Sequence, residues 1–301
     1  MDMEDYPRNI MEFEKRFNSE KACREYLFKI RWTNGFKCPR CGNSKAWPVI
    51  GYLYKCSNCG FKSSVTAGTI FQDTHKSLQL WFKAMWYVTN QKHGISALGL
   101  QRSLGIGSYQ TAWKWLYRLR HAVVRPGRDR IFGTVEVDET YVGGKKTGKR
   151  GRGADGKILV VIVAQIDGKR IGRIRLKRIP DASGDSLNTA IKETIEPGST
   201  IITDGWEGYN KVKTFGYTHK IAKKEGFVGE NLLPKCNTVA ALLKRWLLGT
   251  HQGRAQHIDY YLDEFTFRFN RRTSKSRGML FYRLIQNSVA VSPIHSTKLI
   301  P

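Results

Sequence analysis

Apolar residues recur at helical spacing through the first third of the chain. Residues 9–30 predict one or two short amphipathic helices, and residues 76–90 predict an apolar helix rich in Trp. Residues 95–120 predict a helix, a turn around Ile106, and a second helix that begins at Ser108. Two helices joined by so short a turn resemble a helix-turn-helix.

Beyond residue 127 the pattern changes to that of strands. Residues 133–144 (GTVEVDETYVGG) alternate, with Glu136 and Asp138 on one face and Val135 and Val137 on the other. Such a strand holds a carboxylate rigidly at the edge of a core.

The elements that follow suggest a sheet topology. Residues 158–166 are continuously apolar, so this strand is expected to be covered on both faces. A strand, a helix, a short strand and two further helices are expected at residues 170–179, 185–195, 199–204, 234–249 and 257–272. The order strand, strand, strand, helix, strand is that of an RNase H-like sheet, whose first and fourth strands are neighbours. Asp138 and Asp204, 66 residues apart, are then expected to meet.

Both acids have ordinary alternative interpretations. Acids on one face also suit a solvated edge strand, and the Asp204-Gly205 pair suits a turn. The strand order favours a shared site over these alternatives.

The charge balance predicts a polyanionic partner. The 301 residues hold 51 Lys and Arg against 25 Asp and Glu, a formal charge of +26, spread from end to end. Double-stranded DNA is the partner we expect. The longest purely apolar run, residues 158–164, is too short to span a bilayer, so we expect no membrane and a cytoplasmic protein on DNA or in the nucleoid.

Four of the six cysteines have metal-ligand spacing. They form two C-x2-C pairs, each followed by Gly, at Cys38, Cys41, Cys56 and Cys59. Four thiolates make a closed tetrahedral site, so we predict structural Zn²⁺ in a small ribbon. The alternative is two turns of unliganded cysteines.

Two segments are candidates for DNA contact. The early and basic residues of the helix after Ser108 are those that a recognition helix directs to DNA: Tyr109, Gln110, Lys114 and Arg118. The alternative is a helical hairpin that only links domains. The basic, Gly-rich residues 143–157 are expected to meet a polyanion through Lys145, Lys146, Lys149, Arg150 and Arg152.

The helix at residues 234–249 carries Asn237 and Lys244 seven residues apart, about two turns, on one face. With it, the chain resembles bacterial insertion-sequence transposases that join an N-terminal zinc ribbon to an ISXO-type RNase H-like domain. The resemblance runs from Cys38 almost to the end of the chain, through VDETYVGG, ITDGWEGY, LLKRWLLGTHQG and YLDEFTFRFNRR.

The resemblance implies a metal site and its chemistry. The family often has Glu seven residues before a Lys, and some branches have Asn, so Asp138, Asp204 and Asn237 are expected to hold Mg²⁺ or Mn²⁺, with Lys244 on the DNA phosphate. The implied activity is binding of terminal inverted repeats by a homo-oligomer, with strand cleavage and strand transfer. A neutral amide balances less metal charge than a carboxylate. Three consequences of Asn at this position stay open: weaker metal binding, an inactive enzyme, or help from a further acid. The candidate acids are Glu139, Glu207 and Glu230.

We therefore predict an α+β and α/β chain: a helical segment (1–30), a zinc ribbon (31–72), a helix-turn-helix-like region (73–125), a catalytic domain with an RNase H-like mixed sheet and flanking helices (126–290), and a tail (291–301). Two rival functions remain, a non-catalytic DNA-binding regulator and a structure-specific DNA nuclease.

Overall fold

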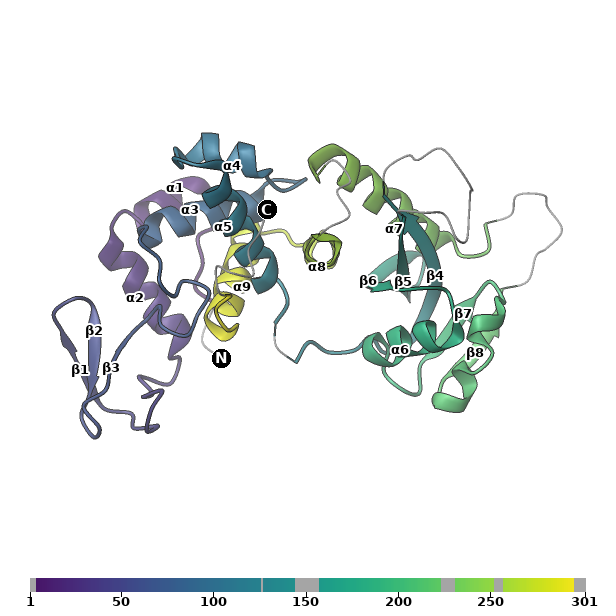
Figure 1. Ribbon diagram of the computed structural model, residues 1–301, viewed down its shortest axis with the longest axis horizontal. Helices are drawn as coiled ribbons and strands as arrows, with labels where there is room; N and C mark the ends of the chain where they lie inside the picture. Colours follow the sequence, from purple (N-terminus) through teal and green to yellow (C-terminus); the bar gives the residue numbers. More distant parts are fainter. Residues whose placement is uncertain (1–3, 126, 144–156, 223–230, 252–256, 295–301) are drawn as a thin grey trace. The chain divides into compact units, whose positions relative to one another are not determined.

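The computed structural model describes residues 4–125, 127–143, 157–222, 231–251 and 257–294. The chain forms two compact units, one made of residues 1–126 with 274–301 and the other of residues 127–273 (Figure 1). Among the helices of the described residues, none has both the length and the apolar content that a membrane span needs.

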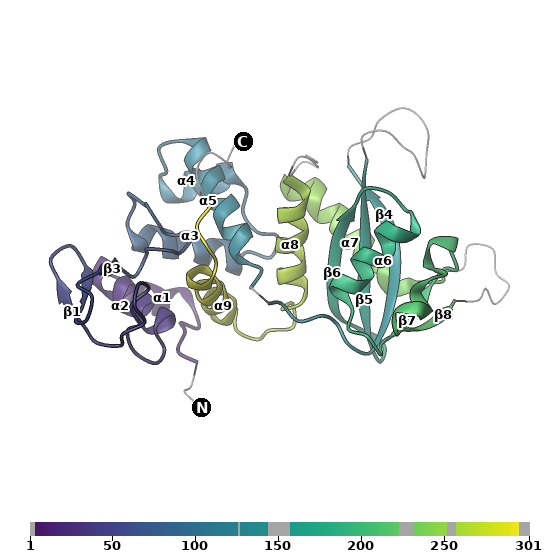
Figure 2. The same cartoon turned by 60° about the horizontal axis from the view of Figure 1, so that its bottom comes forward.

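Helices build most of the first unit (Figure 2). They are α1 (Ile10–Arg16), α2 (Glu20–Arg31), α3 (Leu78–Asn90), α4 (Ala97–Leu104), α5 (Tyr109–Ala122) and α9 (Arg277–Ala290). Phe281 of α9 is fully buried, with its ring centroid 5.4 Å from that of Phe13 and 5.7 Å from those of Phe82 and Trp86. A side chain at Gly278 would collide with the carbonyl oxygen of Pro7, so glycine permits this close packing.

Helix α9 corrects the domain assignment made from the sequence. Residues 274–290 were assigned to the catalytic domain, but α9 packs against the N-terminal helices α2, α3 and α5. The apolar spacing of a helix shows which of its faces is buried, and it does not show which core receives that face.

A three-stranded antiparallel ribbon follows α2. Its strands are β1 (Ala46–Val49), β2 (Leu53–Cys56) and β3 (Lys62–Ser64). One cysteine turn precedes β1 and the other joins β2 to β3. Each has a left-handed glycine after its second cysteine, Gly42 with φ 75° and Gly60 with φ 68°.

The four cysteines come together at these turns as predicted. Their sulfur atoms all lie within 4.8 Å of one another, with 3.7 Å between Cys38 and Cys59 and 3.6 Å between Cys41 and Cys56. A tetrahedral zinc with Zn–S bonds of about 2.3 Å requires sulfurs about 3.8 Å apart. The geometry therefore fits structural zinc.

The second unit is built on a five-stranded mixed sheet. Its strands are β4 (Thr134–Val142), β5 (Ile158–Asp167), β6 (Arg170–Ile179), β7 (Thr200–Thr203) and β8 (Thr218–Ile221). They lie in the order β6-β5-β4-β7-β8; β5 is antiparallel to β4 and β6, and β7 is parallel to β4 and β8. This is the predicted RNase H-like topology, with the first and fourth strands adjacent.

Helices cover both faces of this sheet. On one face, Val135 and Val137 join the core formed with α6 (Gly184–Thr194). On the other face, α7 (Pro234–Trp246) and α8 (Ile258–Phe269) bury a second core against β5 and β6. Three short helical turns complete the unit, at Glu207–Tyr209, Val212–Phe215 and Leu247–His251. Since β5 contributes to both cores, its continuous apolar sequence is explained.

Removal of a zinc ligand tests the ribbon. We expect Cys56→Ser to lose the bound zinc, because three thiolates no longer close the tetrahedral site, and to unfold the ribbon locally. Zinc content by elemental analysis and proteolysis of the ribbon are the measurements. Cys236→Ala is the matched control, since Cys236 is equally buried but lies outside the cluster. Full zinc content in Cys56→Ser would contradict the assignment.

Candidate active site

The pairing of β4 with β7 brings two distant aspartates to one edge of the sheet. The parallel register joins Val135 to Ile201 and Glu136 to Ile202. Continued by two residues along each strand, the same register sets Asp138 beside Asp204. The carboxyl ends of parallel strands are where an open sheet presents groups to a ligand.

The two carboxylates stand in different surroundings. Burial raises the pKa of Asp138, and the negative charge of Asp204 raises it further. The backbone N–H of Glu139 lowers this pKa, because it donates to Oδ1 of Asp138 at 2.8 Å. Asp204 is exposed, and its Oδ1 accepts from the backbone N–H of Trp206 at 3.0 Å. A cation between these carboxylates would offset both the burial and the repulsion.

The first turn of α7 lies beside the same carboxylates. Glu136 Oε2 accepts the backbone N–H groups of Lys235 at 2.7 Å and Cys236 at 3.0 Å. Burial, together with the charges of Asp138 and Glu136, raises the pKa of the Cys236 thiol well above its ordinary range. Cys236, and with it the next residue of α7, therefore lies near the part of β4 that carries Asp138.

That residue is Asn237, which is exposed. Its Nδ2 donates to Oδ1 of Asn231, which leaves its own carbonyl oxygen as the group available to a cation. Among the described residues, one set of three or more His, Cys, Asp or Glu side chains lies close enough together to share an ion. That set is the four cysteines. Within that part of the chain, His, Cys, Asp and Glu side chains alone therefore do not complete a second metal site.

The acids named as possible helpers are not equivalent. Glu139 follows Asp138 on a strand whose side chains alternate, so it faces the α6 side of the sheet. Tyr209 is fully buried on that side, and its burial together with the charge of Glu139 raises the pKa of its phenol. Glu139 is therefore a poor candidate for the face that carries Asp138. Glu207 is exposed in the turn after Asp204. Glu230 lies outside the described residues.

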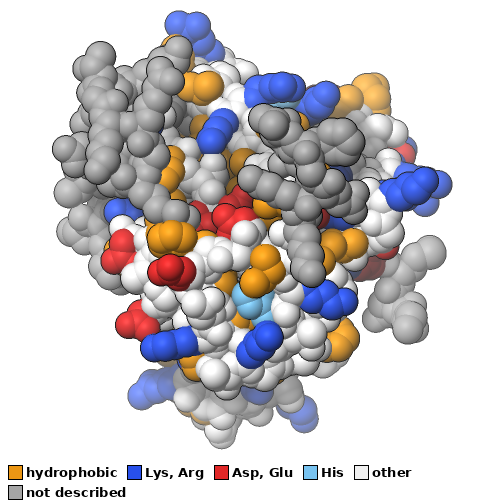
Figure 3. Space-filling model, turned by 90° about the vertical axis from the view of Figure 1, so that its right-hand side faces the viewer, with side chains coloured by type: hydrophobic (Ala, Val, Ile, Leu, Met, Phe, Trp, Pro, Cys, Tyr) orange, Lys and Arg blue, Asp and Glu red, His pale blue; other side chains and the backbone are white. Residues whose placement is uncertain are grey.

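Lys244 lies two turns after Asn237 on the exposed side of α7. With Tyr141, Leu247 and Leu248 it lines a small cavity of about 130 Å³. On the face of this unit seen in Figure 3, acidic side chains gather near the centre and lysines and arginines are spread around them.

The helix-turn-helix segment of the first unit is present. Helix α4 ends at Gly105, whose φ of 62° is left-handed, and Ser108 caps α5 by accepting the backbone N–H of Thr111 at 3.2 Å. Of the residues predicted to face DNA, Tyr109 and Gln110 are exposed, whereas the two basic ones, Lys114 and Arg118, are half-buried. The exposed side chains of α5 are thus those at its start. The five basic residues predicted in the 143–157 loop lie outside the described residues.

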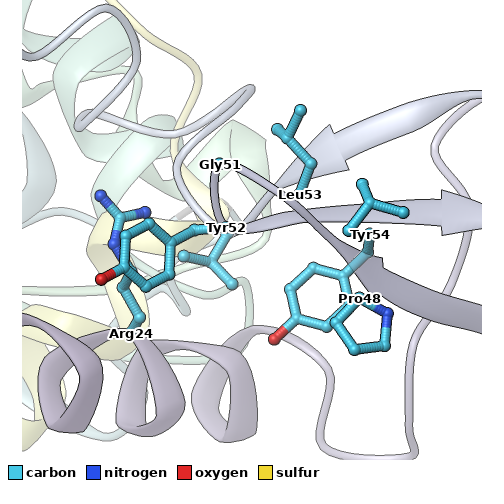
Figure 4. A pocket seen from close by; sticks show the side chains of 8 residues that line it. Arg24, Pro48, Gly51, Tyr52, Leu53 and Tyr54 are labelled. Atoms are coloured by element: carbon cyan, nitrogen blue, oxygen red, sulfur yellow. The ribbon is translucent and has the colours of Figure 1, made fainter.

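A cavity beside the ribbon was not anticipated from the sequence. It measures about 310 Å³ and lies between α2 and the β1–β2 hairpin (Figure 4). Arg24 stacks over Tyr52, 4.4 Å from the guanidinium carbon to the ring centroid, and pairs with Glu20 at 2.8 Å. No short sequence motif signals this cavity, because it forms between elements that are separate in the chain.

Comparison with known proteins identifies both parts of the chain. Residues 130–270 match the ISXO2-like transposase domain, and residues 18–62 match the transposase zinc-ribbon domain. An uncharacterized protein in transposable element ISH50 of Halobacterium salinarum is 26% identical over 281 residues, which cover 84% of this chain and 92% of the relative. Because that relative is archaeal, a bacterial origin for this chain stays an expectation.

Among solved structures, the chain is similar to one in the simian T-cell lymphotropic virus intasome in complex with PP2A regulatory subunit B56 gamma. The identity is 14%, the TM-score is 0.34, and the match covers 62% of this chain and 70% of the other. A likeness this distant adds nothing to the sheet topology already described.

The two domain matches fall on the ribbon with its four cysteines and on the sheet with its paired aspartates. The chain thus carries a transposase zinc-ribbon domain at residues 18–62 and an ISXO2-like transposase domain at residues 130–270.

Proposed function

We propose that this protein is the DNA transposase of an insertion sequence, which binds the terminal inverted repeats and catalyses metal-dependent strand cleavage and strand transfer. The observation that carries the proposal is the β4–β7 register, which sets Asp138 beside Asp204 within an ISXO2-like transposase domain. The protein would act on double-stranded DNA in the cytoplasm, as a homo-oligomer.

Three side chains would hold the divalent cations. Asp138 and Asp204 supply carboxylate oxygens, and Asn237 supplies the amide oxygen left available by its bond to Asn231. Mg²⁺ or Mn²⁺ bound there supplies activation of a water or a 3′-hydroxyl and stabilisation of the leaving oxygen. Lys244 would bind a neighbouring phosphate and fix the position of the strand.

Residues of α5 would contribute to DNA binding. Tyr109 and Gln110 at the start of α5 are placed to meet a groove, and Lys114 and Arg118 to meet phosphates. The basic 143–157 loop, which follows the Asp138 strand in sequence, would extend the contact with DNA through its lysines and arginines.

A strand-transfer assay tests the proposal. Purified protein is incubated with labelled DNA from the element's ends, a target plasmid and Mg²⁺, and we expect nicked and joined products. Asp138→Ala and Asp204→Ala should each reduce the yield of both products more than about 100-fold. Removing a residue that only hydrogen-bonds to a metal ligand costs about 10–100-fold in activity, and removing the ligand itself should cost more. Asp167→Ala, at the exposed end of β5, is the matched control and should retain activity.

The same assay distinguishes the rival functions. Binding of the terminal repeat without nicking by the wild-type protein would indicate a regulator. Cleavage of branched DNA of any sequence, without joining, would indicate a structure-specific nuclease.

Substitution of Asn237 tests the third ligand. We expect Asn237→Ala to lose most activity, whereas Asn237→Asp and Asn237→Glu should preserve or raise it, because a carboxylate oxygen replaces the amide oxygen. The measurement is the cleavage rate as a function of Mg²⁺ concentration. Thr238→Ala, at the next exposed position of α7, is the control. If Asn237→Ala cleaves like the wild type, the assignment is wrong.

Lys244 is tested by the salt dependence of binding. If its ammonium neutralises one phosphate, Lys244→Ala should reduce the slope of log affinity against log salt by about 0.9 and slow cleavage at low salt. Arg245 is also exposed, but as the next residue of α7 it points in a different direction around the helix. Arg245→Ala should therefore slow cleavage less than Lys244→Ala does. Equal effects of the two substitutions would argue against a specific role for Lys244.

A further inference from the structure

Glu136 is a buried carboxylate that the proposed chemistry does not use. It is 4% exposed and lies on β4 two residues before Asp138, on the same face of the sheet. One of its oxygens, Oε2, accepts two backbone N–H groups, from Lys235 at 2.7 Å and from Cys236 at 3.0 Å. Both donors belong to the first turn of α7.

Helix α7 has no cap of its own. Leu233 occupies the N-cap position without a side-chain hydrogen bond, and Pro234, the first helical residue, has no N–H. The next two N–H groups would be left unsatisfied, and Glu136 takes both. The exchange is mutual, because the positive end of the helix offsets the cost of burying the carboxylate, which has no ion pair among the described residues.

This cap connects the two elements that carry the proposed metal ligands. Glu136 is about 7 Å along the strand from Asp138, and Cys236 directly precedes Asn237. A shift of the α7 terminus relative to β4 would therefore change the separation between the Asn237 amide and the two aspartates.

We propose that Glu136 is a positioning residue, which holds the N-terminus of α7 against β4 so that Asn237 meets Asp138 and Asp204 around a divalent cation. This inference rests on the proposed function, because it takes Asn237 as a ligand. Glu136 itself touches neither the cation nor the DNA. Its contribution is the geometry of the third ligand.

Binding of Mn²⁺ to the full-length protein, followed by electron paramagnetic resonance without DNA, gives a readout that does not depend on turnover. We expect Glu136→Met, which has similar length but no acceptor, to weaken Mn²⁺ binding about 10–100-fold. Glu136→Gln keeps an oxygen that can accept the same N–H groups, so a smaller loss is expected. In an Asn237→Ala background, Glu136→Met should add little further loss, because the ligand that it positions is absent.

Two further variants separate positioning from general stabilisation. Ser183→Ala removes the cap of α6, where Ser183 accepts the backbone N–H of Ser186 at 3.3 Å on the other face of the sheet, and should leave Mn²⁺ binding unchanged. Lys235→Pro deletes one of the two donors while Glu136 stays in place, and should weaken Mn²⁺ binding more than Lys235→Ala does. This pair keeps the test available if Glu136→Met fails to fold.

The possible failures are distinguishable. If Asp138→Ala and Asn237→Ala abolish Mn²⁺ binding but Glu136→Met, Glu136→Gln and Lys235→Pro bind like the wild type, the positioning role is wrong and the metal site stands. If Mn²⁺ binding is the same in Asp138→Ala as in the wild type, the proposed metal site itself fails.

Discussion

The parallel pairing of β4 with β7 is the constraint on which the candidate active site depends. A few backbone hydrogen bonds between these strands bring together Asp138 and Asp204, which are separated in the sequence by β5, β6 and α6. The arrangement has an electrostatic cost, since Asp138 is half-buried, partial burial raises its pKa, and the Asp204 charge raises that pKa further. Strands held by two covered cores can sustain that cost, and a bound cation would offset it.

Much of this arrangement was predictable because it rests on local patterns. The alternation in β4 and the continuous apolar run of β5 reflect how many faces of each strand are buried, and the cysteine spacing reflects the geometry of two turns around one ion. The same period of two places Glu139, next to Asp138, on the opposite face of the strand. Strand alternation was thus sufficient to separate these two acids.

Other features depend on contacts between distant segments and could not be predicted. Strand β8 has four residues, too few for a periodic signal, and the register with β7 defines it. Helix α9 has an ordinary apolar face, and the packing of Phe281 against aromatic rings of α1 and α3 decides which unit it joins. The role of Glu136 likewise requires the position of the α7 terminus, about one hundred residues further along the chain.

The amide at position 237 is easier to understand once Glu136 is included. Three carboxylates, Glu136, Asp138 and Asp204, already lie around the strand ends, and the charges of the other two raise the pKa of Asp138 beyond the effect of burial. Glu136 Oε2 accepts two N–H groups of the helix terminus, so Glu136 adds negative charge near Asp138 while that oxygen is already occupied. A carboxylate in place of Asn237 would add a fourth negative charge and increase the repulsion whenever no cation is bound. If Asn237 is the third ligand, as we propose, its neutral oxygen would attract the cation less than a carboxylate would, and it would also limit the repulsion among the carboxylates when no cation is bound.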